Sequence, residues 1–213
     1  MKTHFLKILV LVAAGVTTLA CSKKDDSPAP VAPLPQSVAF EKANTTATDI
    51  PDQTLAGGIA NGTVEIPINI DYVGIIADGA KVYVELDLTH TYPNQLAVEL
   101  ISPAGNTCGL IKRINEPVNG LGRFIAGNKL VFNSTYTTAI PSVDSGTNIP
   151  AGNYKPTFGT NTLPTNVVEV PMATFFAGQS INGVWKIKVY DCYYIGVGLI
   201  NGWKLKFDTG ALQ

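Results

Sequence analysis

Few residues of this chain could do chemistry, and histidine is the scarcest of them. The sequence contains two histidines, and His4 lies in an N-terminal segment that we expect to be removed. A serine peptidase requires a nucleophile, a histidine base and an orienting acid. His90 continues the inward parity of an alternating strand, and no Gly-x-Ser-x-Gly, His-Glu-x-x-His or glycine-rich phosphate motif accompanies it. We therefore predict that His90 is a core histidine held by the following turn rather than a catalytic base.

Carboxylates are the next group to consider. Glu85 and Asp87 lie two apart on one strand, ~6.6 Å from each other, a spacing that is typical of solvated side chains and less often of a glycosidase pair. Asp191 ends an otherwise apolar row, so we expect backbone N–H groups of the next turn to bind it. The same loop could bind calcium through carboxylate and carbonyl oxygens, and we identify no other cofactor or metal site.

Tyrosines form the one candidate recognition cluster. Tyr190 has the outward parity of its strand, and Tyr193 and Tyr194 follow in the adjoining turn. Such aromatic faces could stack on a sugar or anchor a protein partner, and the alternative is that they pack across strands and fill the loop.

Three cysteines are present, and we expect Cys21 to be a lipid site. Cys108 and Cys192 then remain in a compartment where disulfides persist. Two alternatives are open for them, a disulfide or two separately buried thiols.

Two strands near the C-terminus must position Asp191 and the tyrosines. Period-two alternation predicts a hairpin over 183–207 that reverses between Tyr193 and Leu199. Its inward rows contain Trp185, Ile187, Val189 and Asp191 in the first arm and Trp203, Leu205 and Phe207 in the second.

Earlier strands show the same alternation. Residues 82–90 and 96–100 predict a second hairpin around the Tyr92-Pro93-Asn94 turn, and 64–70 predict a strand whose Pro67 favours an edge or a bulge. From 112 to 165 only Leu130–Phe132 is strand-like, and we expect this loop-rich region to carry individual specificity.

The composition agrees with a fold made of strands. Charged residues are 15%, Gly number 20 and Pro 14, and helical periodicity is absent. We therefore predict an all-β, jelly-roll-like sandwich of about eight strands.

The N-terminus indicates export. A basic start and an apolar run over 8–16 predict a signal peptide over 1–20. Thr18-Leu19-Ala20-Cys21 resembles the lipobox of bacterial lipoproteins, with Thr18 where Leu is usual, and this implies acylation of Cys21, against ordinary cleavage without lipid. A Pro-rich tether over 21–37 leads to one domain over 38–213. We expect an outer membrane lipoprotein, and the Lys-Asp-Asp after the cysteine is either a surface-export signal or a solvated linker. A net charge of −1 without basic clusters does not favour nucleic acid.

Two segments carry a family resemblance. The pattern G-x-W-x-I-x-V-x-D followed by G-x-I-N-x-W-x-L-x-F, together with the central His90-Thr91 turn and the Ser102-Pro-x-Gly motif, resembles the P domain (Homo B domain) of proprotein convertases. A weaker match includes Ile50-Pro51-Asp52. The family usually has Gly-Asp before the Leu of the HT turn and an acid at the place of Gly196, where this chain has Asn94-Gln95 and glycine. A site that needs those carboxylates is therefore not carried over.

The resemblance implies a jelly-roll-like sandwich and an association with subtilisin-like serine peptidases, whose catalytic domain is separate. His90, Thr91, Trp185, Asp191 and Trp203 then belong to its structural motif. Our first hypothesis is a non-catalytic, lipid-anchored interaction or stabilising module that binds an envelope protein. A surface lipoprotein that binds glycans is the second, and an accessory part of a peptidase system is the third.

Overall fold

The structure is a computed structural model that describes residues 39–53, 62–114, 122–144 and 146–213. The expected signal peptide, Cys21 and the expected tether over 21–37 lie outside the described residues, as do 115–121 and 145 of the region between 112 and 165. All described residues belong to one compact unit, Val31–Gln213. None of their helices is long and apolar enough to cross a membrane.

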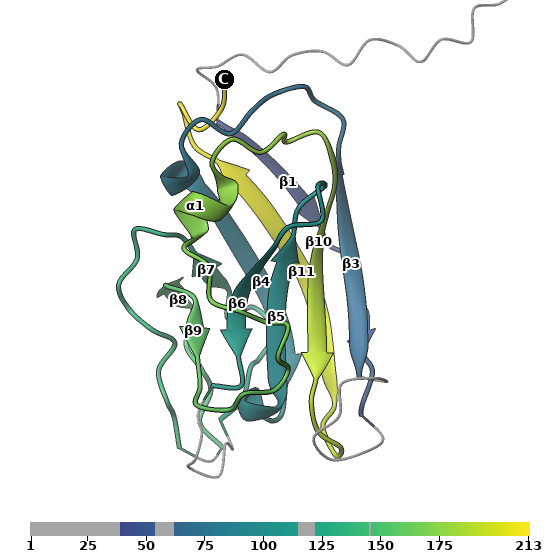
Figure 1. Cartoon of the computed structure of the whole chain (residues 1–213). Coiled ribbons are helices and arrows are strands. Elements are labelled where there is room, and N and C mark those ends of the chain that lie inside the picture. The colour runs from purple at the N-terminus through teal and green to yellow at the C-terminus, as the bar shows by residue number, and fades with distance from the viewer. Residues whose placement is uncertain (1–38, 54–61, 115–121, 145) are drawn as a thin grey trace, which may run out of the picture. The chain divides into compact units, whose positions relative to one another are not determined.

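Two β-sheets pack face to face and confirm the all-β sandwich (Figure 1). The six-stranded sheet has the order β1-β11-β4-β7-β8, with β2 also paired to β11. The five-stranded sheet has the order β3-β10-β5-β6-β9. The strands of the six-stranded sheet are β1 (Phe40–Asn44), β2 (Thr48–Ile50), β4 (Val82–His90), β7 (Leu130–Phe132), β8 (Gly152–Tyr154) and β11 (Gly198–Phe207). Those of the five-stranded sheet are β3 (Thr63–Ile70), β5 (Leu96–Ile101), β6 (Thr107–Lys112), β9 (Thr157–Phe158) and β10 (Gly183–Asp191).

The core confirms the predicted inward rows. In β4 the residues alternate between buried and half-buried along the whole strand, from Val82 to His90. Trp185, Ile187 and Val189 of β10 are fully buried and face the inward row of β11 across the sandwich. Burial of these large apolar side chains from both sheets is the main stabilising contribution to the fold.

The two expected hairpins are wrong, because their arms lie in different sheets. β4 pairs with β11, whereas β5 pairs with β10. The chain therefore crosses the sandwich at the turn between β4 and β5, and it crosses back between β10 and β11. The apolar side chains of both strands point into the core whether the two strands pair in one sheet or lie in opposite sheets. Alternation therefore predicts which residues face inward but not which strands pair. The hairpin that does form is β5–β6, closed by the turn at Ser102–Asn106 with Gly105 at φ +83°.

Several short elements were not predicted. β3 is at the sheet edge, as Pro67 suggested, but β1, β2, β8 and β9 are additional strands of two to five residues. Two 3-10 turns, η1 (Gly79–Lys81) and η2 (Pro93–Gln95), and a short helix, α1 (Met172–Phe176), complete the described elements. Buried Asn133 follows β7, and its amide donates 2.8 Å hydrogen bonds to the carbonyls of Ala80 and Val82. Side-chain hydrogen bonds of this kind leave no periodic signal in a sequence.

Candidate functional site

His90 and Asp191 meet between the two sheets. His90 ends β4 and Asp191 ends β10, both are buried, and His90 Nε2 lies 3.1 Å from Asp191 Oδ2. Asp191 Oδ1 accepts a 3.1 Å hydrogen bond from the Tyr193 N–H. This donor is a backbone N–H of the turn that follows Asp191, as the sequence predicted. His90 Nδ1 lies 3.1 Å from both the backbone nitrogen and the carbonyl oxygen of Tyr92, in the turn that follows β4. These bonds give both side chains a structural role in joining the sheets.

Two glycines cover the imidazole. A Cβ at Gly198 would lie 2.3 Å from His90 Cδ2, and a Cβ at Gly196 would lie 2.8 Å from His90 Cε1. The backbone of the β10–β11 loop therefore packs directly on the ring, which is 1% exposed. Thr91 follows, half-buried, in the turn after β4. Among the described residues, His90 is thus enclosed by the backbone of the following loop.

Calcium binding at the Asp191 loop stays a prediction, and the described contacts of the loop are these. Both carboxylate oxygens of Asp191 are engaged, one by the Tyr193 N–H and one by His90. Within the described ranges no cluster of three or more His, Cys, Asp or Glu could hold a metal. Asp87 and Glu85 are also engaged, since Asp87 accepts from the Gly127 N–H and Glu85 pairs with Lys129 at 2.7 Å. Glu85 and Asp87 are thus partly exposed surface carboxylates with partners of their own.

Tyr190 lies on the outer face of β10 as its parity predicts, but it is buried there, so it is not an exposed recognition residue. It is 3% exposed, and its hydroxyl donates to buried Glu99 and accepts a 2.5 Å hydrogen bond from the Asn166 amide. The outer face of β10 is covered here by the segment around Val167, which packs with Tyr190 and Cys192 in a separate small cluster. Strand parity predicts which face a side chain is on, but not whether a loop covers that face.

The cysteines are two separately buried thiols. Cys108 belongs to the main core, while Cys192 lies in the small cluster with Val167, so the disulfide alternative is wrong. Burial raises the pKa of Cys108 to about 12, and such a thiol is not a reactive nucleophile.

The remaining tyrosines form an exposed apolar tip. Tyr193 and Tyr194 are stacked, with ring centroids 4.9 Å apart and an interplanar angle of 17°. They are 37% and 41% exposed, and Ile195 and Val197 beside them are 69% and 75% exposed. We call these four residues the β10–β11 tip. Sequence reasoning identified its tyrosines but missed Ile195 and Val197, although four large apolar residues within five positions of a loop were a usable signal.

The backbone of the tip is held in an unusual conformation. Ile195 has φ +74°, which is uncommon for any side chain and a strained position for a β-branched one. The Asp52 carboxylate accepts hydrogen bonds from the N–H groups of Ile195 at 3.2 Å and Gly196 at 3.3 Å. Asp52 and Asp191 thus bind the loop from two sides. The tip is an exposed apolar surface on a fixed support, which suits it to binding a protein partner.

The comparison with protein-family models agrees with the P-domain resemblance. The family model described as proprotein convertase P-domain matches residues 79–123, which include β4, β5 and β6. The leupeptin-inactivating enzyme 1 of Streptomyces exfoliatus is 25% identical over 176 residues, and the match covers 82% of this chain and 27% of that protein. A serine protease of Aeromonas sobria has a TM-score of 0.40 at 16% identity, with 82% of this chain and 27% of that chain covered. The same protease in complex with its chaperone gives a TM-score of 0.39. The chain thus matches about a quarter of the length of these relatives.

Proposed function

We propose that this protein is a non-catalytic P-domain module that binds a protein of the cell envelope through the β10–β11 tip. The observation that carries the proposal is the tip itself, because four apolar side chains are exposed on a backbone fixed by Asp52 and Asp191. Exposed aromatic and aliphatic clusters on a rigid scaffold are typical of binding surfaces, where aromatic residues contribute most of the affinity. The lipid anchor on Cys21 would hold the module at the outer membrane and leave the tip free to bind.

The partner that we favour is a serine peptidase of the envelope. The P-domain match over 79–123 and the alignment with part of the leupeptin-inactivating enzyme support this choice, since the matched region is a minor part of that enzyme. In this role the module is an accessory part of a peptidase system and either recruits or stabilises its partner. His90 acts in the fold and not in turnover, because its ring contacts Asp191 and Tyr92 inside the sandwich.

The test is affinity capture of envelope proteins by the full chain, with a fluorophosphonate probe to label serine hydrolases. We expect the wild-type chain to retain a labelled protein. The tip variant Tyr193→Ala/Tyr194→Ala should retain at least about tenfold less, since interface aromatics often contribute ~2 kcal/mol or more each. Tyr72→Ala is the matched control, because Tyr72 is also 37% exposed but lies outside the tip.

Both variants should keep thermal midpoints within a few degrees of the wild type, since the substituted side chains are partly exposed. Capture of the same labelled protein by the tip variant at wild-type levels would place recognition elsewhere on the surface. If the chain retains only envelope proteins that the probe does not label, the protein-binding role stands and the serine peptidase is not the partner.

A further inference from the structure

A groove crosses the outer face of the six-stranded sheet. The strand register places Ala43, Lys204, Glu85, Val131 and Asn153 opposite one another in a single row across β1, β11, β4, β7 and β8. Ala43 and Val131 are short, and the sheet face is hollowed at both places. The two hollows have volumes of ≈ 320 Å³ and ≈ 280 Å³, and both are bounded by Glu85 and Lys204. They therefore form one elongated depression, which we call the sheet groove.

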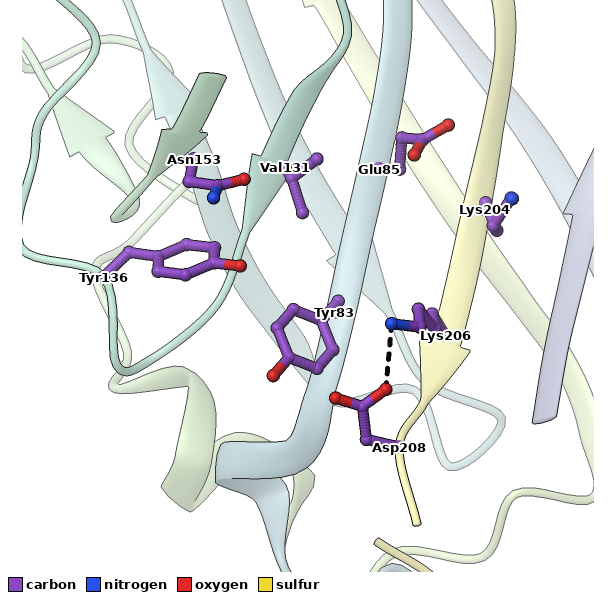
Figure 2. A pocket seen from close by; sticks show the side chains of 8 residues that line it. All are labelled: Tyr83, Glu85, Val131, Tyr136, Asn153, Lys204, Lys206 and Asp208. Atoms are coloured by element: carbon purple, nitrogen blue, oxygen red, sulfur yellow. Dashed lines mark ion pairs between the residues drawn. The ribbon is translucent and has the colours of Figure 1, made fainter. Parts of the chain in front are cut away.

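Two tyrosines form the aromatic side of the larger hollow (Figure 2). Tyr83 extends from β4 and Tyr136 from the loop after β7, with ring centroids 6.1 Å apart and the planes inclined by 52°. Both tyrosines are half-buried, and Val131 of β7 lines the same hollow opposite Glu85 of β4. Lys206 Nζ lies over one face of the Tyr83 ring, 5.1 Å from its centroid, and this cation–π contact holds the ring in place. The hollow thus offers apolar ring surface at a place that a ligand can reach.

Polar groups surround this aromatic surface, and their charges are matched. Lys206 pairs with Asp208 at 2.9 Å, and Lys204 pairs with Glu41 at 3.1 Å. Asn153 adds an exposed amide on the other side of the larger hollow. The larger hollow is lined by two lysines and two carboxylates, so it has no net charge to attract an anion or a cation. It offers carboxylates that accept hydrogen bonds and the Asn153 amide, which both donates and accepts them.

We propose that the sheet groove binds a neutral oligosaccharide. A sugar ring has an apolar C–H face that packs on Tyr83 or Tyr136, and hydroxyl groups at its edge that bond to the carboxylate and amide groups around the hollow. The elongated shape fits several linked sugar units better than a single one. An anionic glycan or a nucleic acid is disfavoured, because the lysines of the groove are already paired with Glu41, Glu85 and Asp208.

This site is separate from the protein-binding role of the tip. The sheet groove lies on the outward rows of β4 and β11, whereas the tip is the loop between β10 and β11. The two sites share no residue, so each can be removed without the other. A chain with both could hold a partner protein close to a polysaccharide.

The experiment is a titration of the full chain with neutral gluco-, manno-, galacto- and xylo-oligosaccharides, beside sulfated and uronic-acid oligosaccharides as charged probes. We expect binding of at least one neutral series, with an affinity that changes less than about twofold between roughly 0.05 M and 0.5 M salt. Absence of binding by every neutral series at millimolar concentration would overturn the proposal. Binding restricted to the charged probes and lost at high salt would overturn it as well.

Variants locate the site. Tyr136→Ala should weaken binding by about tenfold or more, because it removes a stacking face, while Tyr136→Phe should retain most of it. Asn153→Ala tests the polar side, and its exposed position makes misfolding a poor explanation for lost binding. The tip variant Tyr193→Ala/Tyr194→Ala is the matched control and should bind the oligosaccharide as the wild type does. Unchanged binding by both Tyr136→Ala and Asn153→Ala would show that the sugar binds outside the groove.

Discussion

At the scale of single residues, two departures from the P-domain pattern prove to be in contact. Gln95 replaces the acid of that pattern in η2, and Gly196 replaces another in the β10–β11 loop. A Cβ at Gly196 would lie 2.5 Å from Gln95 Oε1, so the glutamine side chain occupies space that a larger residue at 196 would need. Gln95 Oε1 is buried without a hydrogen-bond partner among the described residues. The Gln95 side chain in this position therefore requires glycine at 196.

Glu99 is the residue where a pH effect on stability is expected. It is 2% exposed, and its Oε1 accepts a hydrogen bond from Tyr190. Burial raises the pKa of Glu99, while the Tyr190 bond and the charge of Lys188 oppose that rise. Because the folded pKa lies above the unfolded value, the folded state binds more protons between the two. Stability from this group is fully present below the unfolded pKa and is lost as the pH rises through the folded pKa.

We predict that Glu99→Gln raises the free energy of unfolding at neutral pH and reduces its fall with rising pH. The amide oxygen can still accept from Tyr190, and the desolvated charge is gone. Chemical denaturation from about pH 4 to about pH 8 measures both effects. Glu65→Gln is the control with the opposite expected effect. Lys186 and Lys188 lower the pKa of Glu65, so its charged form stabilises the fold at neutral pH and the variant should lower the free energy of unfolding there. A Glu99→Gln curve parallel to that of the wild type would contradict the assignment.

At the scale of elements, two neighbouring corners hold the sandwich together. The turn from β4 to β5 and the turn from β10 to β11 both carry the chain from one sheet to the other. The His90–Asp191 contact joins the strand ends before these turns, and the Cys192 N–H donates a 2.8 Å hydrogen bond to the Gln95 carbonyl. Each sheet is therefore tied to the other at the end that presents the tip.

These corners also show what the sequence could predict. Period-two alternation was enough for the sandwich class and for the inward rows of β4, β10 and β11, because burial requires it. It could not decide between a hairpin and a corner, since that choice depends on contacts such as His90–Asp191 that join residues far apart in the chain. For the same reason it could not show that the segment around Val167 buries Tyr190 on the outer face, and it missed the sheet groove, whose Tyr83 and Tyr136 become neighbours only through the pairing of β4 with β7.

Trp185 tests the predicted core at this scale. Its indole packs near Phe176, with centroids 5.8 Å apart, and its Nε1 donates a 3.0 Å hydrogen bond to the Ile181 carbonyl. Trp185→Ala should lower the free energy of unfolding by roughly 3–5 kcal/mol, as large-to-small core substitutions do. Val184→Ala in the same strand is the control, because Val184 is 42% exposed and should change stability by less than about 0.5 kcal/mol. Equal denaturation midpoints for the two variants would refute the inward position of Trp185.

At the scale of the whole molecule, the two proposed surfaces share one rigid support. Trp203 illustrates this, since it lies in β11 of one sheet and donates a 3.1 Å hydrogen bond to the Ile66 carbonyl of the other. The sheet groove and the tip are built from side chains whose backbones belong to this packed body. Binding at either surface then requires little ordering of the backbone, which lowers the entropic cost of association.

The proposed lipid anchoring is the last prediction, and it concerns residues outside the described part of the chain. The apolar run over 8–16 is too short to span a bilayer as a helix, so the proposed attachment rests on acylation of Cys21. One acyl chain binds membranes only marginally, and stable anchoring needs further chains on the same residue. Cys21→Ser should therefore either release the protein from the membrane fraction or leave an uncleaved precursor, and Ser22→Ala should do neither. Fractionation with immunoblotting measures both size and location. A processed Cys21→Ser protein that still sediments with membranes would show that something other than the lipid holds it there.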